Sequence, residues 1–186
     1  SASDVEGDIL TYSVTSGASI TSSLVGNDLT FAPSQDFYGS ESFTVTVNDG
    51  ALENSETFTL TVNAVNDAPV LASVSDANFD EDGVGSASLS ADDVDGDELE
   101  FSITGGSFII ASLTGSSVSF SAPGNYNGSE EFTVSVTDGE YTDSQSITVT
   151  VNAVNDAPTA NAASGATVED QSVVIGLSGD DIDGDN

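Results

Sequence analysis

The sequence contains no lysine, arginine or histidine, against 32 aspartate and glutamate residues, which gives a formal net charge of −32. No side chain can supply a positive partner for a carboxylate, and repulsion between the carboxylates opposes any compact state. Nucleic acid and anionic membranes are excluded as partners, because binding them depends on Lys and Arg. A cluster of acids therefore needs a cation from solvent, since two carboxylates about 4 Å apart repel by about 4 kcal/mol at an effective dielectric of about 20.

Cysteine is absent as well, together with methionine and tryptophan. Without Cys, His and Lys the chain has no thiolate, no Ser–His pair and no Schiff-base amine, and zinc loses its preferred ligands. The lack of cysteine excludes disulfides, so sulfur gives no argument about the compartment. No apolar run approaches the ~20 residues that span a bilayer, and no signal-peptide pattern is present. These absences remove much of enzyme chemistry and any membrane insertion.

A nine-residue stretch, TVNAVNDAP, occurs at Thr61–Pro69 and again at Thr150–Pro158, a spacing of 150 − 61 = 89 residues. Further segments repeat at spacings of 89 or 88, which indicates a tandem array of structural repeats. The chain then divides into 1–66, a repeat that lacks its first strands, 67–155, a complete repeat, and 156–186, the first strands of a third repeat.

The apolar residues alternate with polar ones. Phe132, Val134 and Val136 are one such series, and Ser or Thr fills most positions between them. High charge alone would favour disorder, but 37% of the residues are hydrophobic and their period of two predicts antiparallel strands with one buried face. About seven short strands in 89 residues predict an all-β fold of tandem seven-stranded immunoglobulin-like β-sandwiches.

Acidic residues recur at the ends of these predicted strands, in the sequences NDAP, DVDGD, TDG and ED. Loops at one end of a sandwich lie close together, and calcium takes six to eight oxygen ligands. The sequence therefore predicts calcium sites built from Asp, Asn and backbone oxygens. Two alternatives stay open: DVDGD as a solvated turn, and NDAP as a linker stiffened by its proline alone.

The stretches SADDVDGDELEFSI, FTVSVTDG and ITVTVNAVNDAP resemble the cadherin repeat, and most closely the cadherin-like tandem repeats of large bacterial calcium-dependent surface adhesins. This resemblance covers nearly all of the chain. It implies calcium ions bound between successive repeats, which stiffen the array into a rod. The ligands that it implies fall into three groups. The first junction would use Asn66, Asp67, Asp93, Asp95 and Asp138; the second would use Glu81, Asn155, Asp156, Asp181 and Asp183; Asp4, Glu6 and Asp49 would face a third.

The chain departs from the cadherin pattern in two places. Ala64 and Ala153 stand where the family has an acidic ligand, and the family's Asp-Arg-Glu sequence is missing. We therefore expect fewer ions per junction than in animal cadherins. Glu41 and Glu130 are the candidates to replace the missing acid.

The two ends of the chain are complementary in sequence, because 156–186 followed by 1–66 would make one whole repeat. One hypothesis is head-to-tail self-association by strand complementation, in which 159–179 of one molecule completes 1–66 of the next and a filament forms. The alternative is that the 186 residues are a window of a longer array.

These patterns predict an extracellular, calcium-stiffened structural repeat of a bacterial adhesin or surface filament, whose partners are neighbouring repeats. The alternative is a calcium-dependent carbohydrate-binding module, for which Tyr38, Tyr126 and Tyr141 are the aromatic candidates. A glycosidase with paired carboxylates needs a cleft, which small sandwich repeats lack, so we expect no catalytic residues.

Overall fold

The computed structural model describes residues 2–3 and 5–184, and it separates into two compact units, Ser1–Asn66 (unit 1) and Asp67–Asn186 (unit 2). Every regular element of the described residues is a β-strand. The all-β fold class is therefore confirmed. Each unit is described below on its own.

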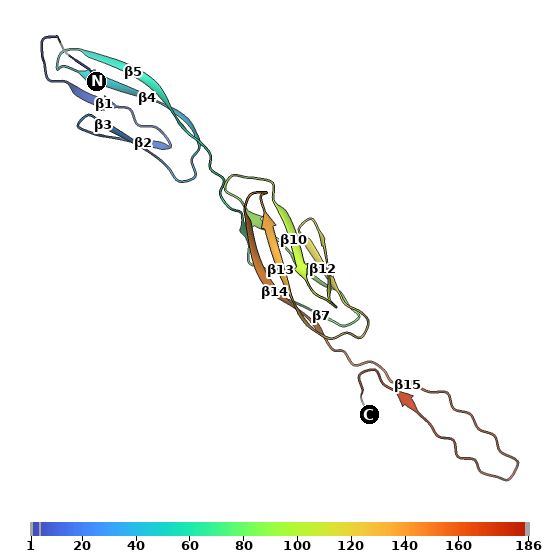
Figure 1. The fold of residues 1–186 in the computed structure, drawn as a ribbon. Helices are drawn as coiled ribbons and strands as arrows, with labels where there is room; N and C mark the ends of the chain where they lie inside the picture. The colour runs from blue at the N-terminus through green and yellow to red at the C-terminus, as the bar shows by residue number, and fades with distance from the viewer. Residues whose placement is uncertain (1, 4, 185–186) are drawn as a thin grey trace. The chain divides into compact units, whose positions relative to one another are not determined.

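Residues 67–155 of unit 2, called the complete repeat, form a sandwich of two sheets (Figure 1). One sheet has the order β10 (Glu100–Gly105), β13 (Gly128–Thr137), β14 (Thr142–Asn152) and β7 (Ala77–Asp80). The other has the order β11 (Ile110–Thr114), β12 (Ser117–Ser121) and β8 (Gly85–Ser88), and a short pair joins β6 (Val70–Leu71) to β9 (Ala91–Asp92). Seven strands result if β6 with β7, and β8 with β9, are each counted as one interrupted strand.

The predicted alternation places the core between these sheets. Phe120, Phe132 and Val134 are at most 1% exposed, and the rings of Phe120 and Phe132 meet edge to face with centroids 5.4 Å apart. Such a pair adds about 0.5–1.5 kcal/mol beyond the area that it buries. All pairings in the complete repeat are antiparallel except that of β7 with β14. This parallel pairing places Asp80, at the end of β7, opposite Asn152, at the end of β14.

Unit 1 contains the equivalents of the last five of these strands. One sheet has the order β1 (Thr11–Val14), β4 (Gly39–Asn48) and β5 (Glu53–Val62), and the other pairs β2 (Ile20–Val25) with β3 (Asp28–Pro33). Its core is a cluster of three rings, in which Phe31 and Phe58 both contact the fully buried Phe43. Equivalents of β6 to β9 do not occur among the described residues of unit 1.

Residues 156–184 of unit 2 follow the complete repeat as a long, open hairpin (Figure 1). Strands β15 (Thr159–Ala160) and β16 (Gly179–Asp180) pair antiparallel. This pairing reproduces that of β6 with β9 at the corresponding positions. The hairpin carries exposed apolar side chains, including Val174 and Leu177.

Candidate cation sites

The DVDGD sequence forms a tight loop after β9, called the acidic loop (Asp93–Asp97). Oδ1 of Asp93 accepts hydrogen bonds from the backbone N–H groups of Asp95 (2.9 Å), Gly96 (3.0 Å) and Asp97 (3.3 Å). Gly96 has φ +78°, a conformation that costs little energy without a Cβ. Oδ1 of Asp93 thus holds the loop, and Oδ2 of the same carboxylate takes no part in these three bonds.

The carboxylates of this loop converge. Oxygen atoms of Asp93, Asp95 and Asp97 lie within 4.8 Å of one another, a grouping of three acids that among the described residues is found here alone. The backbone N–H of Asp67, in the NDAP linker, donates to Oδ2 of Asp95 at 2.7 Å. Oδ2 of Asp93 is buried and has no hydrogen-bond partner. A buried carboxylate oxygen among other acids fits a bound cation.

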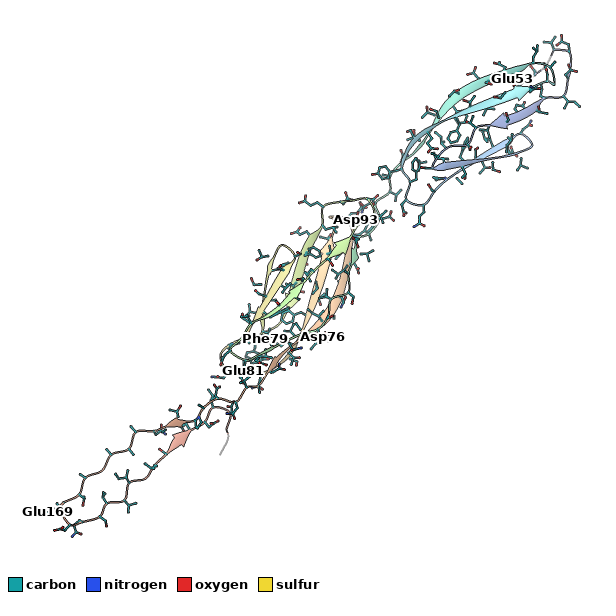
Figure 2. The ribbon with its side chains drawn as sticks, turned by 180° about the vertical axis from the view of Figure 1, so that it is seen from behind. Glu53, Asp76, Phe79, Glu81, Asp93 and Glu169 are labelled. Carbon is teal, nitrogen blue, oxygen red and sulfur yellow. The ribbon has the colours of Figure 1, made fainter. Side chains whose placement is uncertain are left out.

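Glu81 forms the centre of a second site at the other end of the complete repeat (Figure 2). It is 6% exposed, and among the described residues it is the single charged side chain that is buried. The parallel pairing of β7 with β14 positions it: the Glu81 N–H donates to the carbonyl of Asn152 at 2.9 Å. Oε1 of Glu81 accepts from the N–H of Val154 at 2.5 Å, while Oε2 is buried without a partner.

Asp156 lies beside Glu81 and is linked to the loop that follows β16. Its N–H donates to Oδ2 of Asp183 at 2.6 Å, and the Asp183 N–H donates to Oδ1 of Asp181 at 3.0 Å. Burial raises the pKa of the Asp156 carboxyl, and the charges of Asp183, Asp82, Glu81 and Asp181 raise it further. Oδ2 of Asp156 is also buried without a hydrogen-bond partner. These five acids are called the Glu81 cluster.

Both sites fit a hard divalent cation. Their donors are all oxygen atoms, which calcium and magnesium prefer over nitrogen or sulfur. Three carboxylate oxygens, on Glu81, Asp93 and Asp156, are buried and unpaired, and the sequence has no Lys, Arg or His to neutralise them. Transfer of an ionised carboxylate out of water without compensation is unfavourable, and a cation would supply that compensation.

The other predicted ligands have different positions. Asp49 and Asp138 each close a turn with Oδ1, which accepts two backbone N–H groups at 2.7 Å; these bonds, from Leu52 first, lower the pKa of Asp49. Asn155 is exposed and donates from Nδ2 to the Asp156 carbonyl at 2.9 Å. Asn66 is half-buried at the end of unit 1 and Glu6 is exposed. Asp4 lies outside the described residues.

Glu41 and Glu130 accept hydrogen bonds from backbone N–H groups through their side-chain carboxylates. Oxygens of Glu130 accept from the N–H groups of Ser107 (2.8 Å), Phe108 (3.1 Å) and Ile109 (2.9 Å). These bonds, with that of Ser107 the largest contribution, lower the pKa of Glu130. Glu41 accepts in the same way from Ser19 and Ile20 in unit 1. The oxygens of these glutamates thus hold the loop before β2 or β11, and their expected role as replacement ligands stays a prediction.

The predicted ligand sets omitted two residues, Asp97 of the acidic loop and Asp82, which is described here. Its charge raises the pKa of Asp156, and its Oδ1 accepts from the N–H of Asn125 at 3.2 Å. The signal for it was the pair ED at Glu81–Asp82, which recurs at Glu169–Asp170.

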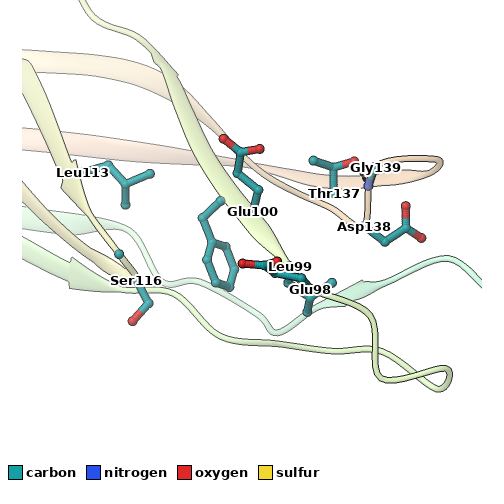
Figure 3. Close-up of a pocket in the computed structure, with 10 residues that line it drawn as sticks. Glu98, Leu99, Glu100, Leu113, Ser116, Thr137, Asp138 and Gly139 are labelled. Atoms are coloured by element: carbon teal, nitrogen blue, oxygen red, sulfur yellow. Dashed lines mark hydrogen bonds between the residues drawn. The ribbon is translucent and has the colours of Figure 1, made fainter.

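A surface pocket of about 920 Å³ lies at the acidic-loop end of the complete repeat (Figure 3). Leu99, Phe101 and Leu113 form its apolar part, and Glu100 and Asp138 are among its acids. The carboxylates of Glu100 and Asp138 point in different directions from their strands (Figure 3).

The family model for the bacterial Ig domain matches residues 1–63 and 66–150. The chain belongs to the bacterial Ig domain family. Its two matched stretches correspond to unit 1 and to most of the complete repeat. No described helix of this bacterial Ig chain has the length and apolar character needed to cross a membrane.

Three known proteins are similar to parts of this bacterial Ig chain. Chitinase A of Pseudoalteromonas piscicida is 37% identical over 105 residues, which are 54% of this chain and 13% of that protein. An endo-fucoidan hydrolase of glycoside hydrolase family 107 is 26% identical with a TM-score of 0.38, over 80% of this chain and 24% of that one. Human protocadherin-24 EC1-2 is 17% identical with a TM-score of 0.48, over 82% of this chain and 85% of that one. The chain thus spans about one eighth of the curated relative.

Proposed function

We propose that this chain is a calcium-stiffened structural repeat of an extracellular bacterial protein. The observation that carries the proposal is the Glu81 cluster, in which a buried carboxylate with an unpaired oxygen lies beside Asp156. The cluster combines residues before, within and after the linker at 152–158. A cation held there would fix the direction in which residues 156–184 leave the complete repeat.

The residues that would hold calcium are Glu81, Asp156, Asp181 and Asp183 in the Glu81 cluster, and Asp93, Asp95 and Asp97 in the acidic loop. The ion supplies positive charge that the chain lacks. The chain's own groups orient these oxygens: the N–H of Asp156 holds Asp183, and the N–H of Asp67 holds Asp95. Extracellular calcium modules bind with dissociation constants of about 10⁻⁴–10⁻³ M, which suits a protein outside the cell.

The test is thermal unfolding of the 186-residue chain in EDTA and across a calcium titration from about 10⁻⁵ to 10⁻² M, with small-angle X-ray scattering on the same samples. A ligand that binds the folded state alone raises stability by about 2.7 kcal/mol at 100 times its dissociation constant. We expect a melting temperature that rises with calcium and a longer, more uniform particle. Magnesium at equal ionic strength is the control, because its stricter octahedral geometry suits loop-built sites less well. Melting and shape that ignore calcium would overturn the proposal.

A second function, binding of a neutral polysaccharide, is favoured by a stacked pair of aromatic rings, in which Phe108 is exposed and Tyr126 is half-buried against the core. Phe108 is 57% exposed and stacks on Tyr126, with ring centroids 5.2 Å apart and planes at 17°. Glu130 fixes the Phe108 backbone, so the ring surface is presented from an anchored loop. Tyr38 and Tyr141 are also exposed, at 55% and 44%, but neither has a stacking partner among the described residues.

The relative named chitinase and the charge of this chain both favour chitin as the probe. A net charge of −32 repels acidic polysaccharides, whereas chitin is neutral. Co-sedimentation of the purified chain with insoluble chitin, in calcium and in EDTA, distinguishes the two functions. Retention on chitin supports the binding function, and a calcium-dependent melting temperature without retention supports the structural function alone.

A further inference from the structure

Strand β10 of the complete repeat leaves one of its edges open. It is the end strand of the sheet β10–β13–β14–β7, and it pairs antiparallel with β13 over Glu100–Gly105. Among the described residues no strand pairs with its other edge. The backbone N–H and C=O groups of such an edge are available to an added strand. β10 can therefore act as a template for strand addition.

The pocket of about 920 Å³ described above is lined by the start of this strand (Figure 3). Leu99 and Phe101 line it from the β10 sheet, and Leu113 lines it from β11, the end strand of the other sheet. All three side chains are half-buried and pack against the core. The pocket is thus an opening onto the margin of the core, between the end strands of the two sheets, and its volume lies in the range of about 300–1,000 Å³ of ligand sites.

Acidic and apolar residues alternate along the part of the chain that lines this pocket. Glu98 and Glu100 are exposed, whereas Leu99 and Phe101 are half-buried. Successive side chains of a strand point to opposite faces, so the two glutamates lie on the outer face and the two apolar side chains on the core-facing side. A strand added beside β10 would therefore meet carboxylates on one face and apolar surface on the other.

The two glutamates are specific to the complete repeat. At the equivalent positions of unit 1, 89 residues earlier, Ile9 replaces Glu98 and Thr11 replaces Glu100, while the positions between and after them stay apolar. Strand β1 of unit 1 is also an end strand, so an open edge of this fold does not require acids there. The charge of the β10 edge is therefore a property of one repeat and not of the fold.

The charge of this edge decides which strand can be added to it. A second copy of this chain has no Lys, Arg or His, so it has no positive side chain to place opposite Glu98 and Glu100. Like charges directly opposite each other on neighbouring strands are destabilising, whereas opposite charges are stabilising. Acids at an open edge thus oppose pairing between copies and favour a basic partner, which is a selection by repulsion as well as by attraction.

We propose that the open edge of β10 binds an extended, basic peptide segment of another protein, in which basic and apolar residues alternate. The backbone of the segment pairs with β10, as in other cases of strand addition. Its apolar side chains enter the pocket, and its Lys or Arg side chains lie opposite Glu98 and Glu100 on the outer face. The methylene stems of these basic side chains also cover apolar surface at the pocket rim. The alternation along β10 thus sets the sequence pattern of the partner.

The test compares two synthetic peptides of identical composition, capped at both ends. In one, three arginines alternate with three valines; in the other, the three arginines precede the three valines. Calorimetric titration measures their binding to the 186-residue chain in calcium and about 0.15 M salt, which screens charges more than about 8 Å apart. Calcium is present so that the peptides do not act as counter-ions of the acidic clusters. We expect the alternating peptide to bind at least about fivefold more tightly, because it alone places every charge on one face of a strand.

A pair of matched variants separates this edge from the charge of the whole chain. Glu98→Gln with Glu100→Gln should weaken binding of the alternating peptide about fivefold, because two cross-strand charge pairs are lost. The control is Glu53→Gln with Glu56→Gln, two exposed acids of β5 in unit 1, which changes the net charge by the same amount. It should weaken binding by less than about twofold, since distant charges are screened. Equal losses from the two double variants would overturn the proposal.

Hydrogen exchange of the backbone amides locates the peptide on the wild-type chain. The alternating peptide should slow exchange in residues 98–105, because the outward N–H groups of β10 become hydrogen-bonded. Residues 9–16, which include β1 and lack the two glutamates, should exchange at an unchanged rate and serve as the internal control. Absence of protection in 98–105, equal protection of both segments, or equal affinity for the two peptides would overturn the proposal.

Discussion

The N–H of Asp156 donates to Oδ2 of Asp183 at 2.6 Å, and the N–H of Asp67 donates to Oδ2 of Asp95 at 2.7 Å. The two bonds occupy equivalent positions at successive linkers. Each ties the aspartate of an NDAP linker to the second acid of the DVDGD or DIDGD loop that follows it. The arrangement is thus a property of the repeat, and it holds acidic oxygens together before any cation is considered.

Glu81→Gln should have opposite effects with and without calcium. In EDTA the variant is expected to melt at a higher temperature, because it removes a buried charge that has an unpaired oxygen. In calcium it is expected to lose at least about tenfold in affinity, since loss of even an outer-shell partner costs that much. Calorimetric titration and melting curves in both conditions measure the two effects. Glu131→Gln, an exposed acid on β13, is the control and should change neither. A variant that is destabilised equally in both conditions would mean that Glu81 has only a structural role.

Glu130 should make stability depend on acid pH. Backbone hydrogen bonds, first that of Ser107, lower the pKa of this carboxyl in the folded state. Its stabilising contribution is therefore present above its ordinary pKa of 4.5 and is lost as the pH falls through the lower, folded-state pKa. Glu130→Gln should melt several degrees lower at neutral pH and show a shallower loss of stability in acid. An unchanged acid profile, measured in EDTA to separate it from cation binding, would contradict this role.

Gly85→Val should destabilise the complete repeat, and Phe79→Val should restore much of the loss. The valine side chain would collide with the Phe79 ring, and overpacking of this kind costs about 1–3 kcal/mol. Phe79→Val alone should also destabilise, through the cavity that it leaves. A double-mutant cycle by denaturant unfolding measures the coupling, which contacting residues show at about 0.5–3 kcal/mol. Additive effects would mean that the two side chains do not compete for the same volume.

Phe108→Ala should abolish retention on chitin if the ring pair is a sugar-binding surface. The side chain is mostly exposed, so the fold should be nearly unaffected. A melting curve that matches the wild type would verify this. The control is Tyr141→Ala, which removes an exposed ring that has no stacking partner in the described structure. This variant should keep its retention on chitin. Equal binding by the wild type and the Phe108→Ala variant would exclude this surface.

The sequence by itself determined the fold class and the acidic composition of the candidate cation sites. Alternation of period two, together with an 89-residue repeat, indicated tandem units built of β-strands, because a pleated strand places every second side chain on one face. The absence of Lys, Arg and His meant that clustered acids would have no internal counter-charge. Both conclusions rest on local pattern and on composition, which need no knowledge of tertiary contacts.

Tertiary structure decided which acids meet and which only hold the backbone. Glu81 and Glu130 are both acids near strand ends, yet parallel pairing of β7 with β14 buries Glu81 with an unpaired oxygen, and the loop before β11 occupies Glu130 with three N–H groups. Sequence spacing cannot separate these roles, because each depends on residues more than 20 positions away.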